Sequence, residues 1–304
     1  MRPTLRQLQY LVAIADTGRF GDAARRLNVS QPSLSNQIAD LETELGASLI
    51  ERGRHGAFMT PLGLDMVERA RQILQDVEDM KAAARVTYAD LSGRMRLGTL
   101  PSVGPYLLPT ATKRLHEKYP ELRLIVREER TIDLDQHLSS GQFDLVISTA
   151  ADHPGRKAIP LFEESLWVCA APDDPISASK GPIKIEELEG KSLLTLGPGH
   201  RFSQEVAHLS GLAGGYISEE YQGTSLDATR QMAMTGYGVA VLPSLYVEVE
   251  ARRDPDIVVR PIDHPDARRT ISLIWRERSP LTRSFMLIGD LFKNTAEELL
   301  GQKS

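Results

Sequence analysis

Residues 20 to 45 are the stretch that most restricts how this chain can fold. The segment "FGDAARRL" places its alanines on one side and Arg25 and Arg26 on the other, as in a short amphipathic helix. After a three-residue break a second helical pattern begins, with Pro32 in its first turn, where a missing N–H loses no hydrogen bond. Two short helices joined by so tight a break predict a helix-turn-helix.

The second of these helices has two distinct faces at 100 degrees per residue. The apolar stripe consists of Leu34, Ile38, Leu41 and Leu45, and the polar face consists of Ser33, Asn36, Gln37 and Asp40. Hydroxyl and amide side chains can donate and accept hydrogen bonds at base edges in a DNA major groove. An ordinary solvated surface helix would show the same pattern, so this face alone leaves both interpretations open.

The segment "LIERGRHGAFMT" that follows favours the DNA interpretation. It offers a short strand, a basic turn flanked by glycines and a second strand, and so predicts a winged helix-turn-helix over residues 1–60. This region holds seven arginines, no lysine and six acidic residues, which gives a formal charge of only plus one. We expect phosphate contacts from backbone amides at the start of the polar helix and from four side chains, Arg25, Arg26, Arg52 and Arg54.

The stretch "FGDAARRLNVSQPSLSNQIADLETELGASLIERGRHGAFMTPLG" resembles the DNA-binding domain of LysR-type transcriptional regulators. The match covers the alanine pair, the Val-Ser-Gln-Pro turn, the Ile-x-x-Leu-Glu-x-x-Leu-Gly run and the Leu-x-Glu-Arg wing entry. The resemblance implies a sequence-specific transcriptional activator that binds double-stranded promoter DNA and needs no cofactor or metal, with RNA polymerase as a further expected partner. The expected DNA-binding residues are Arg25, Arg26, Gln31, Pro32, Ser33, Asn36, Gln37, Arg52 and Arg54.

Residues 61–90 form one continuous helical pattern. The apolar positions Met66, Ala70, Ile73, Val77, Met80 and Ala84 are spaced alternately by four and three, which is typical of a coiled-coil seam. A helix packed on its own domain is the alternative. The seam predicts a homodimer through this linker helix, the resemblance implies the same, and a homotetramer is expected because one module carries so little positive charge.

From residue 91 to residue 304 the pattern changes to short apolar strands separated by helices. "MRLGTLPSVGPYLLPTATKRLHEKYPELRLIVREE" reads as strand, loop, helix and strand, and the region from residue 192 repeats the pattern. Two such units predict two mainly parallel sheets covered by helices. The resemblance implies an effector-binding domain of two Rossmann-like subdomains, as in periplasmic binding proteins. Subdomain I is expected at about 91–165 and 267–304, and subdomain II at about 166–266.

The stretches "VGPYLLP", "GTSLDATRQMAMTGYGVAVLPSL" and "RRTISLIWRERSPL" in this half resemble OxyR-like peroxide sensors. Where those sensors carry two redox cysteines nine residues apart, this chain has Arg201 and Ser210, which can form neither a sulfenic acid nor a disulfide. The single cysteine, Cys169, lies in the apolar run "ESLWVCAAP", which favours a buried, inert thiol. A regulator that responds to oxidation of this one thiol is the alternative.

Polar residues near the expected strand ends are the candidate effector contacts. Hydroxyl groups at such positions and at a helix N-terminus suit a small anionic metabolite such as a carboxylate. Helix capping explains Thr224 and Ser225 equally well, and Arg201 could either clamp a carboxylate or lie on a surface loop. The candidates are Ser102, Thr131, His200, Arg201, Thr224 and Ser225.

Composition and motifs argue against other classes of protein. A single cysteine allows no internal disulfide, and no apolar run approaches the roughly 20 residues of a membrane helix. The N-terminus lacks the apolar core of a signal peptide, so we expect a cytoplasmic protein. An enzyme is disfavoured because no P-loop, G-x-S-x-G, H-E-x-x-H or C-x-x-C motif occurs. A small-molecule binding protein that works without DNA is disfavoured as well, because the chain carries the N-terminal helix-turn-helix module.

Overall fold

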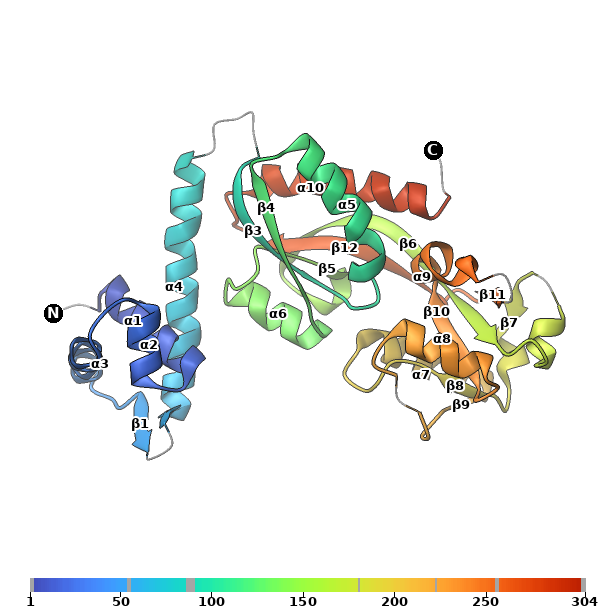
Figure 1. Ribbon diagram of the computed structural model, residues 1–304, viewed down its shortest axis with the longest axis horizontal. Helices are drawn as coiled ribbons and strands as arrows, with labels where there is room; N and C mark the ends of the chain where they lie inside the picture. The colour runs from blue at the N-terminus through green and yellow to red at the C-terminus, as the bar shows by residue number, and fades with distance from the viewer. Residues whose placement is uncertain are drawn as a thin grey trace. The chain divides into compact units, whose positions relative to one another are not determined.

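The computed structural model describes residues 3–53, 56–85, 91–179, 181–221, 223–254 and 257–301. The chain divides into an N-terminal unit, which ends with the long helix α4, and a C-terminal unit, which begins with strand β3 (Figure 1). Each unit has a hydrophobic core of its own.

Three helices, a two-stranded hairpin and a long helix make up the N-terminal unit. In chain order these are α1 (Leu5–Thr17), α2 (Phe20–Arg26), α3 (Gln31–Leu45), β1 (Ile50–Gly53), β2 (Gly56–Met59) and α4 (Pro61–Arg85). The three short helices enclose Ile14, Leu34 and Ile38, none of which has any exposed surface. Because β1 and β2 pair antiparallel directly after α3, the predicted winged helix-turn-helix is confirmed.

Side chains on α3 fix both the start of this helix and the path of the chain after it. Ser30 caps the helix by accepting a hydrogen bond from the N–H of Ser33 at 3.3 Å. Glu42 Oε1 accepts from the backbone N–H groups of Leu49 and Ile50 at 2.7 and 3.0 Å. This carboxylate therefore ties the beginning of the wing to the last turn of α3.

The apolar residues of α4 divide between two environments. Met66 and Ala70 pack against the core of the N-terminal unit, and Ala70 has no exposed surface. By contrast, 45% of Ile73 and 65% of Met80 are exposed. The predicted seam is therefore wrong for its first turns, because α1 packs along this part of α4 and covers it. The side chain of Ala84 lies outside the described residues.

The C-terminal unit is built on strands in the order β4-β3-β5-β12-β6-β10-β8-β9, and β11 and β7 join beside β6. The strands are β3 (Gly93–Thr99), β4 (Leu122–Glu128), β5 (Leu145–Thr149), β6 (Arg156–Ala170), β7 (Ile183–Lys184), β8 (Ser192–Leu194), β9 (Tyr216–Ile217), β10 (Val239–Pro243), β11 (Val258–Asp263) and β12 (Arg268–Arg276). The α-helices are α5 (Gly104–Lys118), α6 (Thr131–Ser139), α7 (Arg201–Ala213), α8 (Leu226–Met234), α9 (Ser244–Val249) and α10 (Thr282–Leu299).

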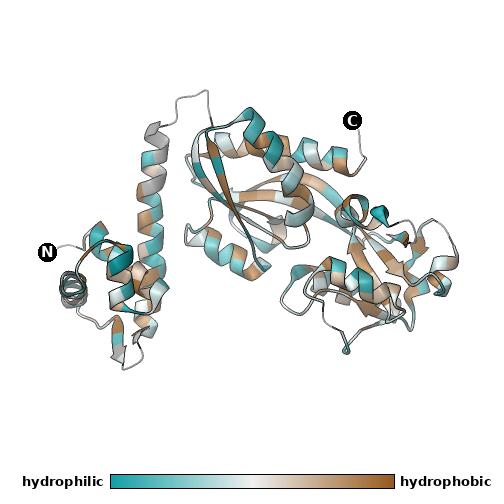
Figure 2. Cartoon of the chain, in the orientation of Figure 1, coloured by the Kyte–Doolittle hydropathy of each residue, from teal (hydrophilic) through white to brown (hydrophobic). Residues whose placement is uncertain are grey.

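Strand β6 is shared by the two groups of strands. From Arg156 to Ser165 it pairs with β12, and from Leu166 to Ala170 it pairs with β10 and β11. Strands β3, β4 and β5 are parallel to one another, as are β8, β9 and β10, so the carboxyl ends of each trio share one edge. The predicted α/β fold is confirmed, but the two predicted sheets are joined through β6 and β12 into one sheet. The apolar residues concentrate on its strands (Figure 2).

Candidate functional site

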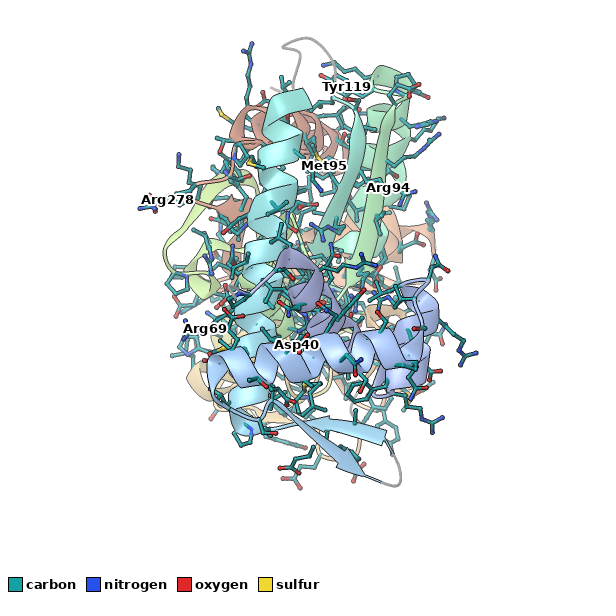
Figure 3. All side chains as sticks on the ribbon, turned by 90° about the vertical axis from the view of Figure 1, so that its left-hand side faces the viewer. Asp40, Arg69, Arg94, Met95, Tyr119 and Arg278 are labelled. Carbon is teal, nitrogen blue, oxygen red and sulfur yellow. The ribbon has the colours of Figure 1, made fainter. Side chains whose placement is uncertain are left out.

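Helix α3 presents its polar face to solvent. Ser33 and Asn36 are exposed and Gln37 is half-buried, whereas Leu34, Ile38 and Leu41 have no exposed surface. Asp40 is labelled on the same helix in Figure 3 and is exposed as well. Gln31 and Pro32 are also exposed, in the first turn. Leu45, expected in the apolar stripe, is 42% exposed because it stands at the end of the helix.

Two of the arginines that are expected to contact phosphates lie on α2, and their side chains are exposed to solvent. Arg25 pairs with Asp22 and keeps 84% of its side chain exposed, and Arg26 pairs with Asp16 at 3.1 Å and keeps 57% exposed. Surface pairs of this kind hold a guanidinium only weakly, so a phosphate can replace the carboxylate. The side chain of Arg52, in β1, and all of Arg54 lie outside the described residues.

The buried guanidinium of Arg269 lies near the point where β6 changes its pairing from β12 to β10 and β11. Arg269 stands directly opposite Glu164, and their side chains are 4% and 0% exposed. Arg269 Nη1 also donates to Glu205 Oε2 of α7, and Nη2 donates to Ser102 Oγ in the loop after β3, both at 3.0 Å. One side chain thus joins both groups of strands. Burial raises the pKa of Glu164, and the charge of Arg269 opposes this shift.

Arg201, the first residue of α7, lies beside this network. Its Nη1 is 3.5 Å from Asp152 Oδ1, at the end of the short 3-10 helix after β5, and its Nε is 3.6 Å from Glu205 Oε1. Both separations exceed the roughly 2.7–2.9 Å of a charge-assisted hydrogen bond. The guanidinium is therefore held near two carboxylates without a close contact to either.

The other expected effector residues have different environments. Thr131 opens α6 and its Oγ1 is buried, whereas Thr224 is exposed. Ser225 caps α8 by accepting from the N–H of Ala228 at 3.2 Å, so capping accounts for its hydroxyl. Burial, and to a smaller degree the charge of nearby Arg130, lowers the pKa of His200, so this imidazole is uncharged at neutral pH.

Two hollows flank the buried guanidinium. The larger, of about 620 Å³, is lined by Thr149, Arg201, Glu205 and Arg269 among others, and so by residues of both groups of strands. Its size is that of a small-molecule site, roughly 300–1,000 Å³. We call it the cleft.

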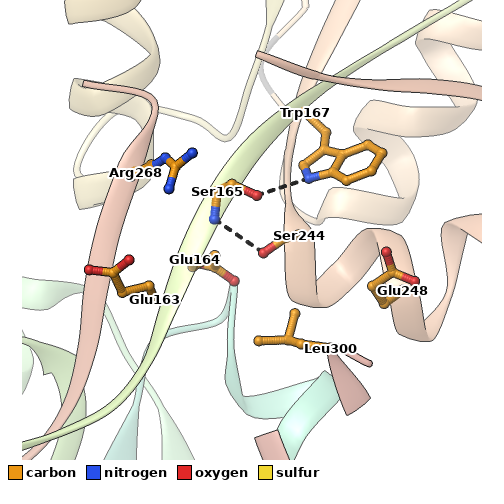
Figure 4. Close-up of a pocket in the computed structure, with 8 residues that line it drawn as sticks. All are labelled: Glu163, Glu164, Ser165, Trp167, Ser244, Glu248, Arg268 and Leu300. Carbon is orange, nitrogen blue, oxygen red and sulfur yellow. Dashed lines mark hydrogen bonds between the residues drawn. The ribbon is translucent and has the colours of Figure 1, made fainter. Parts of the chain in front are cut away.

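The smaller hollow, of about 200 Å³, lies beside the same crossing strands (Figure 4). Glu164 lines it together with Trp167, whose Nε1 donates to Ser165 Oγ at 3.0 Å. The N–H of Ser165 donates in turn to Ser244 Oγ at 3.2 Å. These hydrogen bonds join three of its polar residues to one another, and its volume lies below the roughly 300–1,000 Å³ of a small-molecule site, so the cleft is the stronger candidate for a ligand.

Cys169 lies at the centre of the second group of strands. It pairs with Ala240 of β10 on one side and with Val259 of β11 on the other, and it has no exposed surface. Burial raises the pKa of its thiol to about 12. A protonated, enclosed thiol is a poor nucleophile, so the structure favours an inert core residue.

Arg269, Glu164 and Glu205 were not among the expected site residues. A signal for the first two exists in the sequence, because each is a charge at an inward position of an apolar strand. In "RRTISLIW", strict alternation places Arg269 on the same face as Ile271 and Leu273. No comparable signal marks Glu205, which only the packing of α7 brings to Arg269.

Two family models match this chain. Residues 5–64 match the bacterial regulatory helix-turn-helix proteins of the LysR family, and residues 89–296 match the LysR substrate binding domain. The chain therefore belongs to the LysR family, and it is a DNA-binding transcriptional regulator with an effector-binding domain.

Individual relatives agree with this family. The DNA-binding transcriptional dual regulator OxyR of Escherichia coli K12 is 35% identical over 95% of this chain and 94% of its own length. A full-length OxyR variant from Pseudomonas aeruginosa is 32% identical, with a TM-score of 0.78 over 96% of this chain and 98% of that one. The regulator CbnR in complex with its target DNA is 25% identical, with a TM-score of 0.64 over 95% and 99%.

Proposed function

We propose that a small molecule bound in the cleft controls how this regulator binds promoter DNA. The observation that carries the proposal is the contact of Arg269 with Ser102 on one side and with Glu205 on the other. A ligand that competes with Arg269 for Ser102 or Glu205 changes the equilibrium between two arrangements of the two groups of strands. It can shift this equilibrium only as far as its affinities for the two arrangements differ.

In the DNA-binding unit, we propose base contacts from Ser33, Asn36 and Gln37 and phosphate contacts from Arg25 and Arg26, with Arg52 and Arg54 in the wing. The exposed positions Ile73 and Met80 of α4 support a homodimer through this helix. We further propose a homotetramer that activates transcription in the cytoplasm through RNA polymerase, without catalysis. Peroxide sensing by two cysteines is not part of this function, because Arg201 and Ser210 stand at the relevant positions.

A footprint of the purified protein on DNA upstream of its own gene tests the effector role. We expect the small-molecule filtrate of a cell extract to change the footprint of the wild type. Arg201→Ala is expected to protect the same DNA but to show no change with the filtrate. Arg253→Ala is the control, because its side chain is 70% exposed and does not line the cleft, and it should respond like the wild type. A wild-type footprint that no filtrate changes, or a variant Arg201→Ala that responds like the wild type, contradicts the proposal.

None of the helices in the described ranges combines enough length and hydropathy to span a bilayer.

A further inference from the structure

A buried glutamine, Gln7, joins the start of α1 to the middle of α3. It is only 6% exposed. Its Oε1 accepts hydrogen bonds from the backbone N–H of Thr4 at 2.9 Å and from Thr4 Oγ1 at 3.0 Å. Its Nε2 donates to the backbone carbonyl of Gln37 at 3.3 Å. This one side chain therefore completes the cap of α1 and also holds α3 at Gln37, thirty residues further along the chain.

The chemistry of the two partners fixes which end of the Gln7 amide faces which helix. A backbone N–H can only donate, and a carbonyl oxygen can only accept, so the amide oxygen faces Thr4 and the amide nitrogen faces Gln37. A capping box needs only the oxygen and accepts glutamate as readily as glutamine. The donation to Gln37 is therefore a feature that capping does not explain.

Helix α3 does not need this bond in order to form. The carbonyl of Gln37 lies inside the helix, where it accepts from the N–H four residues later, and its second lone pair is the one that Gln7 uses. What the bond fixes is the position of α3 against α1. Hydrogen bonds to base edges form only at roughly 2.7–3.2 Å, so a small shift of α3 changes what the side chain of Gln37 can reach.

We propose that Gln7 is a positioning residue for sequence recognition, which holds the base-reading part of α3 in place at Gln37. This inference rests on the base contacts proposed above and adds a residue that acts through one of them. An anchor that served stability alone would, when broken, weaken binding to every DNA sequence alike. A positioning residue, when changed, lowers affinity for the preferred sequence and leaves affinity for random DNA as it was.

Gln7→Glu separates the two roles, because glutamate keeps the acceptor for Thr4 and has no N–H for Gln37. Fluorescence anisotropy measures affinity for DNA upstream of the protein's own gene and for random DNA of equal length. We expect the ratio of these affinities to fall by about fivefold or more, the effect of one hydrogen bond. The salt dependence of random-DNA binding should stay unchanged, because the phosphate contacts remain.

Gln9→Glu is the control for the added charge. Gln9 is exposed on the same helix, two residues from Gln7, so this variant brings the same carboxylate to α1 and leaves the bond to Gln37 in place. Its ratio of affinities should stay within about twofold of the wild type.

Gln7→Met removes the donor without adding a charge. Its control is Thr4→Ala, which removes the hydroxyl that accepts from the N–H of Gln7 at 3.2 Å but keeps Gln7 Nε2 on Gln37. Both variants weaken the start of α1, and only Gln7→Met is expected to lower the ratio of affinities. Partial unfolding reduces the active concentration for both DNAs equally, so the ratio still reports recognition.

A double variant shows whether Gln7 acts through Gln37. Gln37→Ala already removes the side chain that is to be positioned, so adding Gln7→Met should change the ratio by less than about twofold more. Two full, additive losses would overturn the inference.

The inference also fails if Gln7→Glu and Gln7→Met keep the wild-type ratio, or if Gln9→Glu and Thr4→Ala lower it as much. If Gln37→Ala lowers the ratio in those cases, only the positioning role of Gln7 is lost and the proposed base contact stands. If the wild type does not distinguish the upstream DNA from random DNA, the proposed sequence recognition fails as well.

Discussion

Arg269 and Glu164 face each other across β12 and β6, with Arg269 Nη2 2.6 Å and Nε 2.8 Å from the same oxygen, Glu164 Oε2. The guanidinium stacks over the ring of Phe202, 5.2 Å from its centroid. Its remaining donors reach Ser102 and Glu205. A pair so enclosed contributes more to holding one arrangement of the two strand groups than to net stability, because desolvation offsets its attraction.

Removing Arg269 leaves Glu164 buried without its counter-charge. We expect Arg269→Ala to lower the free energy of unfolding by about 3–5 kcal/mol, the usual effect of breaking a buried ion pair. Arg268→Ala, one residue away and exposed, should change it by less than about 0.5 kcal/mol. Urea denaturation followed by circular dichroism measures both, and equal losses would contradict the buried role of Arg269.

Cys169 should resist thiol reagents in the native protein. Its pKa is raised from 9.0 to about 12 by burial, so at pH 8 its thiolate fraction is about a thousandfold below that of an open thiol. Because the folded pKa is raised, the unfolded thiol ionises first, and this group's stabilising contribution disappears as pH rises from about 9 to 12. With one cysteine in the chain, mass spectrometry after iodoacetamide should find no label natively and one label in urea. Labelling of the native protein at pH 8 would instead support the alternative, a regulator that responds to oxidation of this one thiol.

Substitutions on α3 and α2 should separate base recognition from phosphate contact. Gln37→Ala is expected to reduce discrimination at one base pair by about 1–3 kcal/mol while binding to random DNA changes little. Arg25→Ala should weaken binding to all sequences and reduce the slope of log affinity against log salt by about 1. Fluorescence anisotropy across a salt series distinguishes them, and exchanged effects would refute the assignment.

Charges on the exposed part of α4 should dissociate the proposed dimer. Ile73→Asp combined with Met80→Asp places carboxylates where apolar side chains are exposed, so we expect a monomer in sedimentation velocity runs. Arg69→Asp is the control, since Arg69 is 68% exposed on the same helix outside the predicted seam. A double variant that sediments like the wild type would place the dimer contact elsewhere.

The DNA-binding unit could be predicted from the sequence in more detail than the site in the C-terminal unit. Its signals are local, because the helix breaks, the Ser30 cap and the 3.6-residue apolar period all act within a few residues. The seam on α4 was only partly right. A seven-residue period places Met66 and Ala70 on one stripe but does not show whether α1 or a second chain covers that stripe.

Among the expected effector residues, Ser102 and Arg201 lie at the buried ion-pair network, whereas Thr224 and Ser225 are exposed. The sequence could indicate hydroxyls at strand ends, because parallel strands bring those ends to one edge. It could not indicate that Arg269, which is paired with two carboxylates, lies among these hydroxyl groups. That pairing joins Arg269 to residues 64 and 105 positions away.

By itself, the sequence determined the order of the elements, the helix-turn-helix, the α/β class of the C-terminal unit and the absence of a two-cysteine switch, since each depends on residue type or on spacing along the chain. Only the tertiary structure decided which charges meet in the cleft, how far Arg201 lies from Asp152, and that Cys169 is enclosed between β10 and β11. The physical reason is that electrostatic interactions depend on distance and burial in space. A chain shows those only after its distant segments have packed together.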